Sequence, residues 1–171
     1  MTTALRNSAT AKLYSTRIDI PAENRTELIA LLNLSLALTL DLKTQMKQAH
    51  WNVKGMNFYQ LHELFDQMAT QLDDYVDLIA ERVTTLGGMA MGTIRVAAET
   101  SLLPEYPFEI FNGKDHVIAL ADRIAPYAKI VREMIDQTND FEDTDTADLF
   151  TEISRTVDKY LWFLEAHLQG S

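Results

Sequence analysis

Residues 28–53 read LIALLNLSLALTLDLKTQMKQAHWNV, and the spacing of their apolar side chains decides the fold. Apolar or small residues recur at alternating intervals of four and three, at Leu28, Leu32, Ser35, Thr39, Leu42, Met46, Ala49 and Val53. This spacing puts them on one face of an α-helix for about seven turns. The helix is predicted to start at Pro21 and to end between residues 51 and 55, where Gly55 can terminate it.

Helical patterns continue through the rest of the chain. Further long helices are predicted over residues 58–86, 114–138 and 146–168, and a short one over 93–99. The connection between the second and third long helices is long enough to cross the bundle instead of forming a hairpin. Because no strand pattern is present, the prediction is an all-α, ferritin-like four-helix bundle with a short helix in the crossover.

Composition indicates one domain with a short arm. The 171 residues have a net charge of −10, contain no cysteine and include no apolar run of the roughly 20 residues that span a membrane. Residues 1–20 are predicted to form a flexible polar arm, and residues 21–171 the bundle. The arm lacks a hydrophobic signal core, so we expect a cytoplasmic protein without membrane association. The acidic body argues against electrostatic binding of nucleic acid and favours cations.

Five side chains form the candidate metal site. His50 lies about one turn from the end of the first helix, and His62 about one turn into the second, so a short turn brings them to similar heights. Asp66 follows His62 at i+4 on the same face. Asp77 and Glu81 form a second i,i+4 pair, and at 100° per residue they continue the same stripe.

Distance divides this stripe into two halves. His62 and Asp77 are separated by about 22 Å along a helix, which neither one metal ion nor a pair of ions about 4 Å apart can bridge. Either the two halves are unrelated, or they meet across a two-fold axis between antiparallel copies of the second helix. The second arrangement would produce two identical sites per dimer.

Two imidazoles with up to three carboxylates would suit Fe(II), Mn(II) or Zn(II). The Glu-x-x-His motifs of bundles with an intrachain di-iron centre are absent, which argues against that kind of site. Taken singly, a histidine near a helix end is usually structural, and an acidic i,i+4 pair is usually a solvated face. On spacing alone, both the shared metal site and these ordinary roles stay open.

Several motifs resemble the Dps family of mini-ferritins over residues 25–168. They are Lys47-Gln48-Ala49-His50-Trp51-Asn52-Val53-Lys54-Gly55, His62-Glu63-Leu64 with Asp66, Asp77-x-x-Ala80-Glu81-Arg82, Leu86-Gly87-Gly88, Tyr106-Pro107, Asp115-His116, Ala121-Asp122-Arg123, Thr146-Ala147-Asp148 and Asp158-Lys159-x-Leu161-Trp162-Phe163.

The resemblance implies a hollow homododecamer that oxidises Fe(II), typically with hydrogen peroxide or with oxygen, and stores ferric mineral inside. It assigns His50, His62 and Asp66 to one subunit and Asp77 and Glu81 to its two-fold mate. Such a ferroxidase would protect DNA from oxidative damage, and it could associate with the bacterial nucleoid. Zinc or manganese could occupy the same site.

Four side chains receive further assignments. Trp51 adjoins His50 and is a candidate electron donor to stray oxidant, although packing against the site would explain it equally well. Trp162 is predicted to be a core residue. Eight acids and no lysine or arginine lie between Glu133 and Glu152. In similar proteins this region lines three-fold pores that admit Fe(II), which makes Asp148 the first pore candidate and Asp143 the next.

DNA binding is expected to be weak. Family members that bind DNA use lysine-rich tails, whereas this arm has one lysine, two arginines and one aspartate. Twelve tails could still add up by multivalency. Two rival functions remain: a metal buffer for zinc or manganese that does not oxidise, and a structural nucleoid protein, which would need a basic face.

Overall fold

The computed structural model describes residues 12–169, and this part of the chain is all-α. The five helices are α1 (Ala22–Asn52), α2 (Phe58–Thr85), α3 (Ile94–Thr100), α4 (Gly113–Asp140) and α5 (Thr144–Ala166). The only bridge pairing in the described residues joins Lys54 to Asn112. The predicted four long helices and the short helix in the crossover are confirmed.

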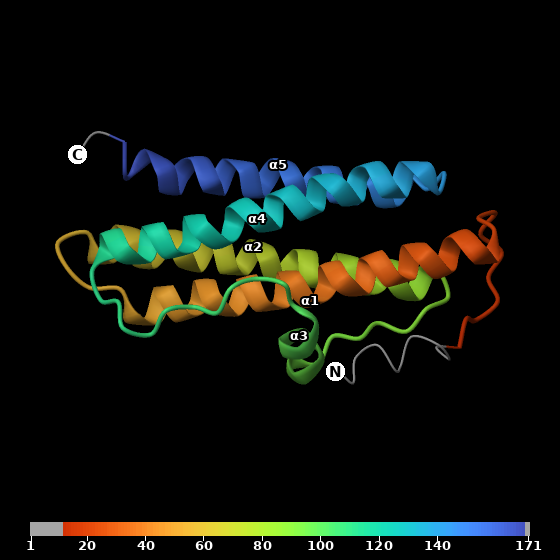
Figure 1. Cartoon of the computed structure of the whole chain (residues 1–171), viewed down its shortest axis with the longest axis horizontal. Helices are drawn as coiled ribbons and strands as arrows, with labels where there is room; N and C mark the ends of the chain where they lie inside the picture. Colours follow the sequence, from red (N-terminus) through yellow and green to blue (C-terminus); the bar gives the residue numbers. More distant parts are fainter. Residues whose placement is uncertain (1–11, 170–171) are drawn as a thin grey trace.

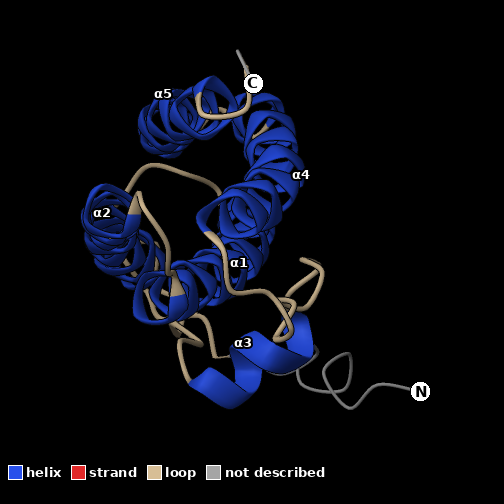
Figure 2. Cartoon of the chain, turned by 90° about the vertical axis from the view of Figure 1, so that its left-hand side faces the viewer, coloured by secondary structure: helices blue, strands red, loops and turns tan. Residues whose placement is uncertain are grey.

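The four long helices pack as two hairpins. α1 pairs with α2, and α4 pairs with α5, while α3 lies against α1 on the outside of the bundle (Figures 1 and 2). The segment from α2 to α4 runs the length of the bundle, as the predicted crossover requires (Figure 1). The α1–α2 turn and the start of α4 therefore share one end, and the α4–α5 turn lies at the other.

α1 is buried on more than its predicted face. Leu36, Ala37 and Leu38 are consecutive and each is fully buried. One stripe of a helix cannot hold three successive residues, but α1 packs against α2, α3 and α4 together. Contacts on several sides, which the periodicity does not reveal, make α1 the most enclosed helix.

Asn57 occupies the N-cap position of α2 without a side-chain cap hydrogen bond. One detail of the sequence-based prediction is wrong. Trp162 is 60% exposed on α5, so it is not a core residue of the subunit. It lies two residues before the buried Leu164, and a separation of about 200° on a helix turns it away from the core.

The described part of the arm lies against the body. The backbone N–H of Tyr14 donates to the Gly87 carbonyl at 2.8 Å, beside the end of α2. The Arg25 guanidinium donates to the carbonyls of Leu86 (2.8 Å) and Ile20 (3.2 Å). Residues 1–11 of the predicted flexible arm lie outside the described residues.

Between residues 12 and 169, no helix has the length and apolar character needed to cross a membrane.

Candidate metal-binding site

The two site histidines bind each other's helices. His50 Nδ1 lies 2.8 Å from the His62 carbonyl, and His62 Nδ1 lies 2.8 Å from the His50 carbonyl. Their rings stack with centroids 3.7 Å apart and planes inclined by 20°. The short turn between α1 and α2 makes this reciprocal contact possible. It places His50 and His62 at similar heights on the two helices, as the sequence predicted.

These contacts decide the tautomer of both rings. A carbonyl oxygen can only accept, so each Nδ1 must carry the proton and donate. In a neutral imidazole the other nitrogen, Nε2, is then left with its lone pair free. A histidine that donates through one nitrogen while presenting the other is arranged as a metal ligand.

Asp66 adds a carboxylate beside the imidazoles. Its Oδ1 lies 3.9 Å from His50 Nε2 and 2.5 Å from Lys47 Nζ. The hydrogen bond from Lys47 holds the pKa of Asp66 below its ordinary value, so the carboxylate is ionised at neutral pH. Lys47 thus places a positive charge beside the ligands in the isolated subunit.

Asp77 and Glu81 lie further along α2, and both are exposed. In the part of the chain that the structure describes, no three histidine, aspartate or glutamate side chains converge on one metal position. Within the subunit His50 lies beside His62 and beside Asp66, without the three converging on one metal position, and Asp77 and Glu81 lie apart from them. Their meeting across a two-fold axis stays a prediction.

Trp51 follows His50 at the end of α1. Its side chain is 66% exposed, and Lys47 Nζ lies 5.7 Å from the centre of its indole ring. Because so much of the ring faces solvent, packing within the subunit does not account for it. The role as electron donor stays a prediction.

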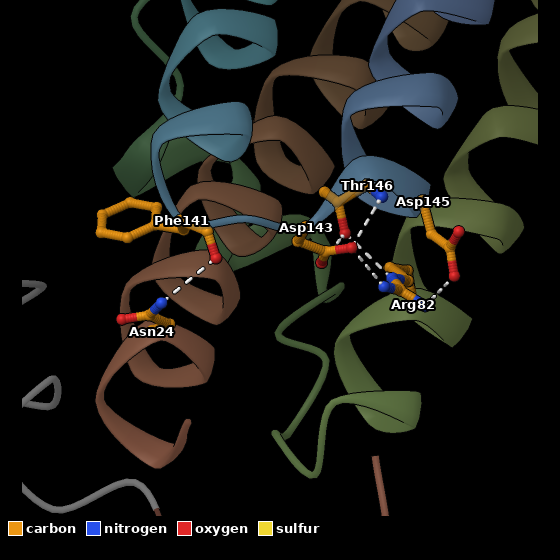
Figure 3. Close-up of polar contacts among 6 residues, drawn as sticks. All are labelled: Asn24, Arg82, Phe141, Asp143, Asp145 and Thr146. Carbon is orange, nitrogen blue, oxygen red and sulfur yellow. Dashed lines mark hydrogen bonds and ion pairs between the residues drawn. The ribbon is translucent and has the colours of Figure 1, made fainter. Parts of the chain in front are cut away.

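The acidic region lies at the opposite end of the bundle. Asp143 caps α5: Oδ1 accepts from the Thr146 N–H at 3.1 Å and from Arg82 Nη2 at 2.7 Å, while Oδ2 accepts from the Thr146 hydroxyl (Figure 3). Burial opposes ionisation of Asp143, but the hydrogen bonds from Thr146 and Arg82 hold its pKa below the ordinary value. Asp148 is exposed on α5. Of the two predicted pore residues, Asp148 is the one that faces solvent; a pore itself stays a prediction.

Comparison with known proteins assigns the family. A ferritin-like domain model matches residues 29–170. The DNA protection during starvation protein of Agrobacterium fabrum is 46% identical over 158 residues, which cover 92% of this chain and 98% of that protein. The chain belongs to the Dps family of ferritin-like proteins.

Solved structures agree with this Dps-family assignment. DpsA14 from Streptomyces coelicolor superposes with a TM-score of 0.90 at 29% identity, covering 95% of this chain and 96% of that one. DpsC from the same organism gives a TM-score of 0.88 at 30% identity, covering 94% of each chain. The predicted ferritin-like fold is confirmed.

Sequence reasoning missed Lys47 as a site residue of this Dps-family chain. The signal was available, because Lys47 precedes His50 by three residues and so lies on the same side of α1. Spacing alone could not tell which of the neighbouring lysines, Lys43 or Lys47, would reach Asp66. That choice depends on how α1 and α2 are aligned in the hairpin.

Proposed function

We propose that this chain is a ferroxidase and iron store that works as a homo-oligomer, most simply a dodecamer. His50, His62 and Asp66 of one subunit would bind Fe(II) together with Asp77 and Glu81 from the two-fold mate. Hydrogen peroxide, or oxygen, would oxidise the iron, and the ferric product would be stored inside. Removal of Fe(II) and peroxide would protect DNA.

The observation that carries this proposal is the reciprocal contact of His50 and His62. It leaves the Nε2 lone pair of each ring free, and His50 Nε2 lies 3.9 Å from the Asp66 carboxylate. Such a set of ligands is incomplete within the described part of one subunit. Asp77 and Glu81 are exposed on the same helix, and Asp77 lies about 22 Å along it from His62. An antiparallel pairing of α2 with its copy would complete both sites at once.

The chemistry follows from the ligand types. Imidazole nitrogen and carboxylate oxygen bind Fe(II), and the carboxylates favour Fe(III) as the product. One peroxide accepts two electrons, so two Fe(II) ions can reduce it without releasing hydroxyl radical. Zinc or manganese could bind the same groups but would not undergo this reaction in the same way.

The charge of the chain bears on the entry of iron, on contact with DNA and on the location of the protein. The carboxylates between Glu133 and Glu152 would attract Fe(II) towards an entrance, with Asp148 as the exposed candidate. With a net charge of −10, DNA contact would depend on the arm and would weaken steeply with salt. A cytoplasmic location suits both the substrate and the relatives named for DNA protection.

The test is anaerobic loading with Fe(II) followed by peroxide, monitored by the absorbance of the ferric product. Asp77→Ala/Glu81→Ala should slow the reaction at least tenfold. Glu109→Ala/Asp122→Ala removes the same two charges from exposed positions elsewhere and should behave as wild type. Size-exclusion chromatography of each variant checks assembly.

Unchanged oxidation in Asp77→Ala/Glu81→Ala would refute the shared site. Binding of Fe(II) without a peroxide-dependent ferric signal in the wild type would favour a metal buffer instead. A mobility shift that persists above physiological salt would contradict weak DNA binding and favour the nucleoid protein.

A further inference from the structure

A buried phenol and a buried imidazole meet where the crossover joins α4, and the proposed ligand set uses neither. Tyr106 and His116 are 5% and 1% exposed. Tyr106 Oη lies 2.6 Å from His116 Nδ1. The rings are inclined by only 17° and their centroids are 6.0 Å apart, so the two meet edge to edge.

The protonation of this pair follows from its surroundings. Burial lowers the pKa of His116, against the opposing effects of the Asp115 carboxylate and the Asn52 backbone, so the ring is neutral at neutral pH. A neutral imidazole can accept the Tyr106 hydroxyl at Nδ1 while Nε2 carries the ring proton. Among the described residues Nε2 makes no hydrogen bond of ordinary geometry. The Asn52 backbone is the group that acts on the ring besides Asp115.

The pair lies at the same end of the bundle as the site histidines. The Lys54 N–H donates to the Phe111 carbonyl at 3.1 Å, which ties the α1–α2 turn to the start of α4. The Asn52 backbone that acts on His116 belongs to the residue after Trp51 and the second after His50. Figure 1 shows the start of α4 beside that turn.

We propose that Tyr106 and His116 form a redox-active pair that takes up single oxidising equivalents escaping from the metal site. The inference rests on the proposed function, which supplies the oxidant. When peroxide meets one Fe(II) instead of two, the products are Fe(III), hydroxide and hydroxyl radical. Exposed Trp51 gives an electron to the radical, which becomes hydroxide.

Tyr106 then restores Trp51 by giving it an electron, and the phenolic proton moves to His116 Nδ1. The result is a neutral tyrosyl radical beside an imidazolium. A further Fe(II) returns one electron to Tyr106 and becomes Fe(III), and the proton returns from His116. One peroxide and two Fe(II) are thus consumed, as in the coupled reaction.

The imidazole is what makes the phenol oxidisable. Loss of an electron makes a phenol strongly acidic, so oxidation is easier when a hydrogen-bonded base takes the proton in the same step. Arg123 lies over the Tyr106 ring at 5.5 Å and disfavours a second positive charge, whereas the Asp115 carboxylate favours one. A purely structural role would need only a hydrogen-bond acceptor at position 116.

The first experiment oxidises the assembled full-length protein without iron, using azide radical generated by pulse radiolysis. Wild type should form a long-lived tyrosyl radical, seen by transient absorption and freeze-quench EPR. Tyr106→Phe should lose it, and His116→Gln, which keeps an acceptor but no base, should lower its yield at least fivefold. Tyr59→Phe, at a position 67% exposed, should leave it unchanged.

The second experiment mixes the protein with Fe(II) and peroxide and records the same EPR signal. Ring-deuterated tyrosine in the unsubstituted protein should narrow the signal, which identifies a tyrosyl radical even if Tyr106→Phe fails to fold. Trp51→Phe should reduce the yield of the tyrosyl radical in this experiment with Fe(II) and peroxide. A long-lived radical unaffected by both Tyr106→Phe and His116→Gln would overturn the proposal.

The two experiments also separate this inference from the proposed function. A Tyr106-dependent radical formed with azide but absent with iron would overturn the link to the metal site. Unchanged iron oxidation in Asp77→Ala/Glu81→Ala would refute the shared site by itself. Normal ferroxidase activity with no Tyr106-dependent radical in either experiment would refute only the redox pair.

Discussion

The Nζ atom of Lys47 lies 2.5 Å from Oδ1 of Asp66, so the subunit holds an ammonium group against a proposed metal ligand. A cation bound at this position must displace Lys47 or share the carboxylate with it. The two side chains are 29% and 44% exposed, which limits the strength of the pair to about 1 kcal/mol. Lys47 is therefore a weak competitor of a metal ion for the Asp66 carboxylate.

Lys47→Met should strengthen binding of Zn(II), a redox-inert probe, by up to about fivefold, because the competing charge is removed. Calorimetric titration of the assembled protein measures this. Lys43→Met is the matched control, since Lys43 pairs with Asp73 across the same two helices. Equal zinc affinity in Lys47→Met and wild type would show that Lys47 does not oppose the metal.

Asp143→Asn should destabilise the subunit by about 2–3 kcal/mol, because it breaks a nearly buried ion pair with Arg82. The pKa of Asp143 is lowered in the folded state, so its contribution is present above the unfolded pKa of about 4 and is lost as pH falls through the folded value. Denaturant unfolding at pH 7 and below pH 4 should show the difference between wild type and Asp143→Asn shrinking in acid. Asp145→Asn, at an 85% exposed side chain, should change little at either pH.

Gly87→Ala should cost more stability than Gly55→Ala. Both glycines have positive φ, +88° and +108°, which strains any other residue by about 1–3 kcal/mol. A Cβ at Gly87 would also lie 2.5 Å from the Tyr14 carbonyl oxygen, whereas nothing lies within 4 Å at Gly55. The thermal unfolding temperature should therefore fall in the order wild type, Gly55→Ala, Gly87→Ala. Equal decreases in the two variants would show that the arm at Tyr14 yields to the added Cβ without cost.

Thr39 and Tyr127 should be energetically coupled across the core. Their hydroxyls are 2.8 Å apart and both residues are fully buried. Thr39→Val would leave the Tyr127 hydroxyl unpaired and should cost about 1–3 kcal/mol, while Thr39→Val/Tyr127→Phe should cost less than the sum of the single changes. A double-mutant cycle in urea gives the coupling, and strict additivity would contradict it.

The helices and their connections could be read from the sequence with small errors. The apolar spacing from Leu28 to Val53 predicted α1, which spans Ala22–Asn52. The last helix was predicted to begin at Thr146, two residues later than the observed start at Thr144. The cap itself is local, because the Asp143 carboxylate accepts from the Thr146 N–H, whereas the contact of Asp143 with Arg82 depends on the packing of α2.

The candidate ligands could also be named from spacing, but their arrangement could not. Helix periodicity placed Asp66 one turn after His62 and put Asp77 out of reach of both. It carried no information on ring orientation, so the reciprocal hydrogen bonds of His50 and His62 appear only in the structure. Whether Asp77 meets a second copy depends on an interface that a single chain does not contain.

By itself the sequence determined the all-α fold, the crossover and the separation of the metal ligands into two halves, because these follow from helix rise and periodicity. The tertiary structure alone decided which nitrogen of each site histidine is free, which lysine reaches Asp66, and that Trp162 faces outward. These features depend on how helices are aligned and rotated against each other. That alignment is set by packing between segments far apart in the chain, which local spacing does not encode.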